Sequence, residues 1–223
     1  MTRSLWLVPL VTACAPVEPA PAPVPRPVQD AAPVVEAQRT DLPPAGYGSL
    51  RQNEFSVEIV DMAVHVKVTP LSERVIRLAA PDTYERLRVL AASRSAQAER
   101  ITEGSGAELF LVSFFSREPN VAYRPEELQL THRGRSLRPA GIIPLTAGWG
   151  RQLLQPEQTQ SAIYVFEPPF DYDLALTIRY SLQENDDWHR VILPLLEEER
   201  TRVASRSGGQ PPDEGVTVRP RGS

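Results

Sequence analysis

The chain has little of the residues that build most catalytic and metal sites. Among its 223 residues there are one cysteine, Cys14, and three histidines, His65, His132 and His189. A lone cysteine forms no disulfide within its own chain, so its presence needs another explanation. The histidines lie far apart, and none stands in a metal-ligand spacing such as His-x-x-x-His. The sequence therefore predicts no metal and no cofactor.

Other functional signatures are also missing. The chain contains no Gly-x-Ser-x-Gly elbow and no glycine-rich phosphate loop, so we expect no enzymatic activity. Its formal net charge of -4 argues against the basic surface of a nucleic-acid binder. Of the 24 basic residues only Lys67 is a lysine; the arginines are scattered among acids, which we interpret as a compositional bias. No segment has the roughly 20 apolar residues that span a bilayer.

Residues 1–13 have the layout of a secretion signal. Arg3 supplies the positive start, residues 5–11 form a short apolar stretch, and Thr12 and Ala13 are the small residues that a signal peptidase requires. Alternative interpretations are an ordinary cleaved signal followed by an incidental cysteine, or a soluble protein with an apolar start. The position of Cys14 directly after the small residues favours a third interpretation.

The tetrapeptide Val11-Thr12-Ala13-Cys14 resembles the lipobox of bacterial lipoproteins. The resemblance implies cleavage before Cys14 and a diacylglyceryl thioether on its thiol. Two or more acyl chains attach a protein stably to a membrane, whereas one chain alone holds it marginally. In that family an aspartate after the cysteine favours the inner membrane; here Ala15 favours the outer membrane of the cell envelope.

The uneven distribution of proline along the chain indicates the domain boundaries. Nine of the residues between 15 and 44 are prolines, which hold the chain in an extended or disordered state at about 3.1 Å per residue. We interpret residues 14–46 as a lipidated, disordered tether, with a proline-rich ligand for a partner groove as the rival interpretation. Residues 47–203 have the size of one domain. Residues 204–223, rich in Gly, Pro, Ser and Arg, read as a disordered tail.

Within the domain, alternating apolar and polar residues predict a series of short strands. They are expected at 55–59, 64–68, 108–116, 128–131, 137–143, 161–167, 174–181 and 188–193. Helical patterns occur after Thr69-Pro70, where Thr69 is the expected cap, from Pro81 to about residue 101, and at 195–202. This order predicts a mostly β fold, an antiparallel β-sandwich with a short helical insertion and a short C-terminal helix.

Several of these features together resemble the immunoglobulin-like domains of bacterial surface lipoproteins, particularly the telokin-like kind of unassigned function. The features are the strand at 108–116, the run Pro125-Glu126-Glu127-Leu128, the run 161–168 after the polar loop 155–158, and the strand at 174–180. The resemblance covers about residues 108–193. It implies an immunoglobulin-like sandwich and says nothing about a ligand.

A few local features are candidate contact residues. Trp149 stands between two glycines, either as a partner contact or, as we favour, as a plug at the open end of the sandwich. Arg133 and Arg135 flank a hairpin turn, where they either contact anionic lipid headgroups or lipopolysaccharide phosphates or, as we favour, are solvated turn charges. Asp171 and Asp173 offer two carboxylates for a weak cation site, but we favour a turn role. The acidic run 197–199 is read as a solvated helix face.

The sequence supports two functional hypotheses. The preferred one is a non-enzymatic binding or assembly module, held to a membrane by its lipid anchor and contacting another envelope protein. The alternative is a periplasmic enzyme or small-ligand-binding protein with a pocket between the helical insertion and the sandwich. A deep cavity lined by converging polar side chains would favour the alternative.

Overall fold

The computed structural model of the protein describes residues 42–208. The predicted signal peptide, Cys14, and most of the predicted tether and tail lie outside the described residues. Between residues 42 and 208, no helix combines the length and apolar character needed to cross a bilayer.

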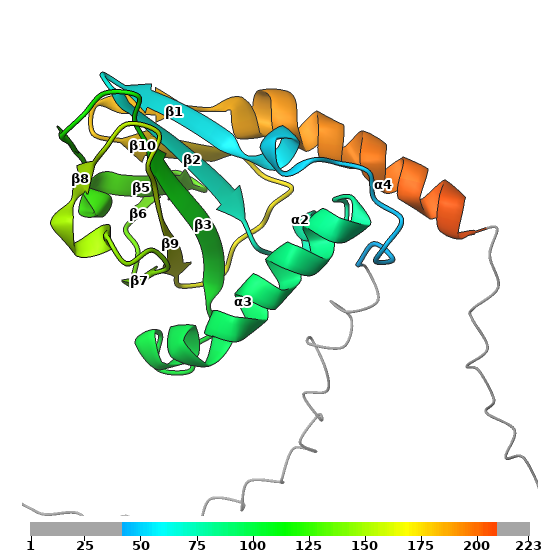
Figure 1. The fold of residues 1–223 in the computed structure, drawn as a ribbon. Coiled ribbons are helices and arrows are strands. Elements are labelled where there is room, and N and C mark those ends of the chain that lie inside the picture. Colours follow the sequence, from blue (N-terminus) through cyan, green and yellow to red (C-terminus); the bar gives the residue numbers. More distant parts are fainter. Residues whose placement is uncertain (1–41, 209–223) are drawn as a thin grey trace, which may run out of the picture.

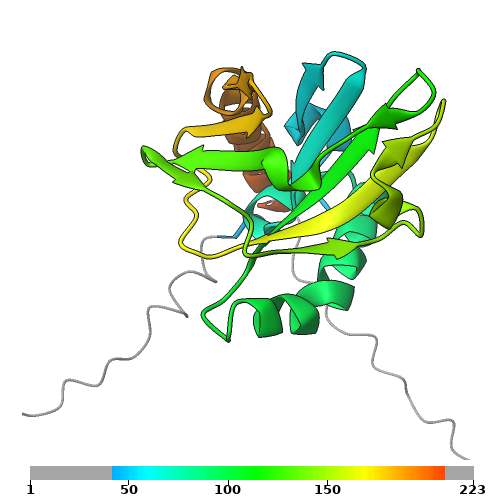
Figure 2. The ribbon, with the colours of Figure 1, turned by 90° about the vertical axis from the view of Figure 1, so that its left-hand side faces the viewer.

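Within residues 42–208 the fold consists of two larger antiparallel sheets, a two-stranded pair and three α-helices (Figures 1 and 2). The larger sheet has the order β1 (Val57–Asp61), β2 (Val64–Pro70), β3 (Glu108–Phe115), β9 (Thr159–Phe166), β7 (Gly141–Pro144). The smaller sheet has the order β11 (Gln183–Asn185), β10 (Leu176–Tyr180), β5 (Leu128–His132), β6 (Arg135–Leu137). A separate pair joins β4 (Val121–Ala122) to β8 (Leu153–Leu154). The helices are α2 (Glu73–Ile76), α3 (Pro81–Ile101) and α4 (Leu193–Ser207).

Short helical turns connect these elements. Three are 3₁₀ turns, η1 (Gln52–Phe55), η2 (Pro125–Glu127) and η3 (Trp149–Arg151), and η4 (Trp188–Ile192) is a π-type turn that runs directly into α4. The mostly β class, the antiparallel sheets and the C-terminal helix expected from the sequence are confirmed, and the arrangement is consistent with a β-sandwich.

The core lies between the inner faces of the two sheets. Alternation along β2 turns Val64, Val66 and Val68 inward, and all three are buried. The central strand β3 contributes Phe110 and Phe114. The Phe114 ring lies 5.5 Å from the Tyr180 ring of the smaller sheet. Aromatic side chains therefore join the two sheets directly.

The helical insertion covers only part of the outer face of the larger sheet. Helix α3 crosses one end of this face (Figure 1) and buries Leu87 and Ala98. Its last residue, Ile101, lies so close to Gly141 that a Cβ at position 141 would come within 2.8 Å of the Ile101 Cγ2 atom. The insertion expected from the sequence is present, and α3 begins at Pro81 as predicted.

The single strand predicted at 137–143 is wrong. Strand β6 ends at Leu137 in the smaller sheet, and β7 begins at Gly141 in the larger sheet, so the chain changes sheets between them.

Two further elements differ from the sequence expectation. Thr69 does not cap a helix, because β2 continues to Pro70 and α2 begins after Ser72. The predicted strand at 188–193 is wrong, since this segment is helical and the partner of β10 is β11. The reason is a four-residue apolar spacing: Trp188, Ile192 and Leu196 are all buried on one helical face.

Helix α4 is also longer than expected. It ends at Ser207, so the predicted boundary between domain and tail, after residue 203, falls inside the helix. Its inner face carries Leu196, Glu199 and Val203, which are fully buried. The acidic run 197–199 was expected to be solvated throughout, and this is wrong for Glu199, because helical spacing brings it onto the same face as Leu196.

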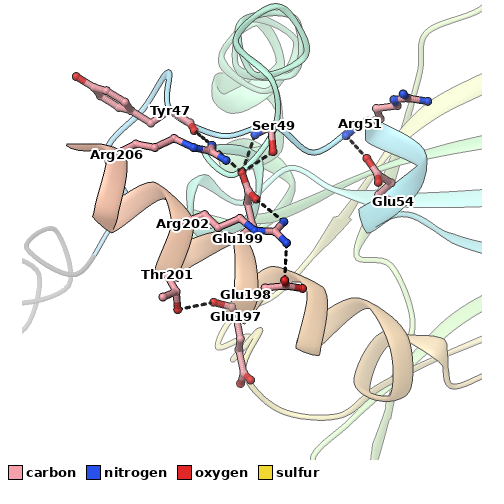
Figure 3. A network of polar contacts seen from close by, with 10 residues as sticks. All are labelled: Tyr47, Ser49, Arg51, Glu54, Glu197, Glu198, Glu199, Thr201, Arg202 and Arg206. Carbon is pink, nitrogen blue, oxygen red and sulfur yellow. Dashed lines mark hydrogen bonds and ion pairs between the residues drawn. The ribbon is translucent and has the colours of Figure 1, made fainter. Parts of the chain in front are cut away.

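A buried carboxylate fastens α4 to the segment that enters the domain. Both the backbone N–H and the hydroxyl of Ser49 donate to Glu199 Oε1 at 2.8 Å (Figure 3). Arg202 and Arg206 form ion pairs with the same carboxylate at 3.4 and 3.2 Å, and Arg206 also donates to the Tyr47 carbonyl at 2.5 Å. We call this set of contacts the Glu199 clamp. It joins the first and last parts of the described chain.

The entering segment is also held by its backbone. Leu50 N donates to the Leu78 carbonyl at 3.1 Å, and Ala80 N donates to the Leu50 carbonyl at 2.9 Å. Gly48 permits this close approach, because a Cβ there would lie 2.2 Å from the Leu78 carbonyl carbon. Before this segment, Arg77 also donates to the Pro43 carbonyl at 3.3 Å, so contacts with the domain begin at about residue 43.

We predict that Glu199→Ala lowers the free energy of unfolding by about 1 to 3 kcal/mol, because Ser49 and the two arginines lose a charged acceptor. Glu197→Ala is the matched control, since Glu197 lies on the exposed face of the same helix. It should change the free energy of unfolding by no more than about 0.5 kcal/mol. Urea unfolding of the three chains measures both effects, and equal losses in the two variants would contradict the role of the clamp.

The clamp also predicts a pH dependence. Burial by itself raises the pKa of Glu199, but the hydrogen bonds from Ser49 and Arg202 and the charge of Arg206 outweigh it and lower the pKa. A carboxylate whose pKa is lower in the folded than in the unfolded state stabilises the fold at pH values above its unfolded-state pKa. This stabilisation is lost as the pH falls through the folded-state pKa. The stability difference between the natural chain and Glu199→Gln should therefore be larger at pH 7 than at pH 3.

This comparison removes the contributions of two other carboxyls with shifted pKa values, Glu108 and Glu85; a hydrogen bond from Arg88 lowers the pKa of Glu85. Burial raises the pKa of Glu108, against a hydrogen bond from Tyr172 and the charge of Arg74 that lower it. Because Glu108 and Glu85 are present in both chains, their effects cancel in the difference. Urea unfolding at pH 7, 5 and 3 gives the result, and a difference that stays constant over this range would rule out the Glu199 linkage.

Candidate functional site

Trp149, a candidate contact residue, is buried. Only 8% of it is exposed, and its ring lies 5.8 Å from Phe114 and 5.5 Å from Tyr123, in both cases edge to face. Tyr123 also donates its hydroxyl to the Trp149 carbonyl at 3.1 Å. This position favours the packing role over the partner contact.

The arginine hairpin is present where the sequence predicted it. Arg133 and Gly134 both have positive φ, at 50° and 72°, as in the tight two-residue turns that join antiparallel strands. The Arg133 guanidinium forms an ion pair with Asp171 at 3.2 Å, and Arg135 is exposed. A contact of Arg133 or Arg135 with a partner stays a prediction.

The two aspartates of the β9–β10 loop bind arginines. Asp171 pairs with Arg133, and its Oδ1 accepts the Asp173 N–H at 3.1 Å, as in an Asx turn. Asp173 pairs with Arg200 at 2.7 Å and with Arg74 at 3.7 Å. These contacts favour the turn role. Within the part of the chain that the structure describes, no three or more His, Cys, Asp or Glu residues are grouped to hold a metal ion.

A different surface gathers mixed functional groups: the uncovered part of the outer face of the larger sheet. A hollow of about 370 Å³ lies on β1, β2, β3 and β9, which we call the sheet-face hollow. Its lining residues are Glu58, Ile59, His65, Val66, Lys67, Ser113, Phe115 and Thr159. None of them belongs to α2 or α3, so the sheet-face hollow is not the pocket expected between the helical insertion and the sandwich.

Strand register explains why residues so distant in sequence meet here. Glu58 pairs with Lys67, Lys67 with Ser113, and Ser113 with Ser161, which makes one continuous row across four strands. We call it the polar row. Its members bind one another in pairs: Lys67 Nζ lies 2.7 Å from Glu58 Oε1, and the Ser113 and Ser161 hydroxyls are 2.8 Å apart.

A second row runs beside the first. Val60 pairs with His65, His65 with Phe115, and Phe115 with Thr159. We call it the ring row. The His65 and Phe115 rings are 6.0 Å apart at an interplanar angle of 64°, an edge-to-face contact. Phe115 is half-buried, whereas Val60, His65 and Thr159 are exposed. The sheet-face hollow thus combines ring faces with hydroxyls and one ion pair.

The ion pair sets the electrostatics of the sheet-face hollow. Glu58 and Lys67 carry opposite charges in contact, and both are partly open to solvent, with side-chain exposed fractions of 59% and 38%. An exposed pair of this kind contributes little to stability, about 0 to 1 kcal/mol. Its donors and acceptors therefore remain available to a ligand at low cost.

Sequence reasoning did not identify this surface. Alternation does place His65 and Lys67 on the outer side of their strand, and it turns Phe115 away from Phe114. The missing information was the register of β2, β3 and β9, which joins segments far apart in the chain. Only that register brings Lys67 beside Ser113 and His65 beside Phe115.

Comparisons with known proteins identify no relative of this chain. No family model, no curated protein and no solved structure matches it.

We predict that Trp149→Ala lowers the free energy of unfolding by about 3 to 5 kcal/mol, because it empties an aromatic site in the core. Trp149→Phe should cost less, since a ring remains. Arg135→Ala on the exposed hairpin serves as the control and should cost no more than about 0.5 kcal/mol. Urea unfolding monitored by far-UV circular dichroism measures all three. Unchanged stability of Trp149→Ala would show that the indole does not support the fold.

Proposed function

We propose that the protein is an exported bacterial lipoprotein, acylated on Cys14, that holds a non-enzymatic binding module in the cell envelope. The lipobox-like tetrapeptide, the proline-rich segment behind it and Ala15 support attachment to the outer membrane. Two antiparallel sheets around one aromatic core support an immunoglobulin-like sandwich as the module. The observation that carries the binding role is the sheet-face hollow, where two ring side chains and several hydrogen-bonding groups lie together on a sheet.

The position of the sheet-face hollow suits a tethered module. Residues 42–47 and the end of α4 lie at one end of the domain, and the β1–β2 turn lies at the other end (Figure 1). The ring row crosses β1 and β2 next to this turn, because Val60 pairs with His65 immediately before Asp61 pairs with Val64. A protein anchored through its N-terminal segment would thus present the sheet-face hollow away from the attachment.

A small-ligand-binding protein is the second candidate. The volume of the sheet-face hollow, about 370 Å³, lies within the usual range of ligand sites, about 300 to 1,000 Å³. The hollow lies on an open sheet face rather than under the helical insertion. This geometry suits a ligand that is only partly enclosed, such as part of a longer polymer.

Mass spectrometry of the mature N-terminus tests the proposed anchoring. We expect the mature chain to begin at Cys14 with acyl chains on its thiol and to sediment with the membrane fraction. Cys14→Ser removes the thiol and should prevent both acylation and cleavage at this position. Recovery of an unmodified natural chain that still begins with Met1 would disprove the anchoring.

A further inference from the structure

The charges of the residues that line the sheet-face hollow indicate which class of ligand it can bind. Its charged pair, Glu58 and Lys67, is internally neutralised at a distance of 2.7 Å. Together these two side chains carry no net charge and so give a charged ligand no net attraction, whereas an uncharged polar ligand can bond to both partners together. The charge balance therefore favours an uncharged ligand rich in hydrogen-bonding groups.

The polar row offers an arrangement that suits neighbouring hydroxyl groups. A hydroxyl both donates and accepts hydrogen bonds. A ligand with two adjacent hydroxyls can accept from the Lys67 ammonium with one and donate to the Glu58 carboxylate with the other. Ser113 and Thr159 extend the set of hydroxyl partners on the same face.

The ring row supplies the apolar half of the site. The His65 ring contacts the Phe115 ring at 6.0 Å, and both rings line the sheet-face hollow. An aromatic side chain on a rigid strand gives a ligand apolar contact at little cost in conformational entropy. A ligand that fits both rows needs an apolar C–H face beside a rim of hydroxyls.

Other ligand classes fit less well. An extended peptide gains its affinity from unpaired backbone groups at a sheet edge, but on the face of the sheet these groups already bond to neighbouring strands. A phosphorylated ligand favours a surplus of cations, whereas here the ammonium of Lys67 lies 2.7 Å from the carboxylate of Glu58, which repels a phosphate. An acyl chain requires an apolar lining, whereas here Glu58, Lys67 and Thr159 lie on the surface.

We propose that the sheet-face hollow binds an uncharged oligosaccharide, with the C–H face of one sugar ring on Phe115 and its hydroxyls bonded to Lys67 and Glu58. This inference rests on the proposed binding role and specifies its ligand. The site holds one or two sugar rings, and the rest of the glycan extends along the open sheet.

Lys67 gives the proposal a sharp test, because it is the only lysine in a chain that otherwise uses arginine. Lysine carries a compact ammonium on a flexible stem, and arginine carries a broad planar group that prefers carboxylates and phosphates. Lys67→Arg keeps the charge and the pair with Glu58 but fills more of the sheet-face hollow. A site that recognises hydroxyl groups should lose affinity, whereas a purely structural ion pair should tolerate the change.

The experiment measures binding of maltotriose, cellotriose and chitotriose to the full-length chain by isothermal titration calorimetry and by NMR. We expect at least one probe to bind saturably and to shift the His65 resonances. Phe115→Ala should weaken that binding roughly tenfold or more, the scale of losing one well-placed aromatic contact. Lys67→Arg should weaken it severalfold. Val89→Ala, on the exposed side of α3, should leave it unchanged.

Two outcomes of these binding measurements would overturn the proposed ligand. No saturable binding of any probe overturns the oligosaccharide assignment, and so does binding that Phe115→Ala and Lys67→Arg leave intact. If Phe115→Ala does not fold, as judged by circular dichroism, Glu58→Gln and Lys67→Arg on the exposed polar row carry the test. Acylation of Cys14 is measured separately, so failure of the sugar assignment is distinguishable from failure of the anchoring.

Discussion

Contact between aromatic rings across the two sheets is the interaction on which the fold depends. Phe114, the second-last residue of β3, lies 4.7 Å from Tyr123, 5.8 Å from Trp149 and 5.5 Å from Tyr180. These partners come from a loop, a helical turn and the opposite sheet. With no disulfide available in the described domain, this aromatic cluster and the aliphatic residues of β2 supply the cohesion that a small sandwich needs.

The central strand serves both faces of its sheet. Its inward residues, Phe110, Val112 and Phe114, are fully buried in the core. Its outward residues change character along the strand, from Leu111, buried on the part of the face that the helical insertion covers, to Ser113 and Phe115 on the uncovered part. A single strand thereby contributes both to a buried part of the outer face and to the sheet-face hollow.

Local patterns predicted the local structure well. Alternation identified β1, β2, β3 and β9, Pro81 marked the start of α3, and Arg133-Gly134 marked a hairpin turn. Prediction failed at 188–193, where apolar residues four apart were read as a strand although they form one face of a helix. It also failed for Glu199, since an acidic run gives no sign that its third member turns inward.

The sheet-face hollow shows why such sites escape sequence reasoning. Each residue type in it is ordinary on its own strand, and its meaning depends on which strands are neighbours and in which register. Those facts follow from the topology β1-β2-β3-β9, which joins the first third of the domain to its last half. Single-chain patterns carry no information about such pairings, whereas they do indicate which side of a strand a residue occupies.

The Glu199 clamp has a mechanical consequence for a protein held by its N-terminal segment. A pulling force on that segment meets the contacts of Tyr47 with Arg206 and of Ser49 with Glu199 before it reaches β1. The load therefore passes into α4 and is shared along a whole helix rather than peeling an edge strand from its sheet. Such an arrangement protects the edge strand β1 from being pulled away from β2 one residue pair at a time.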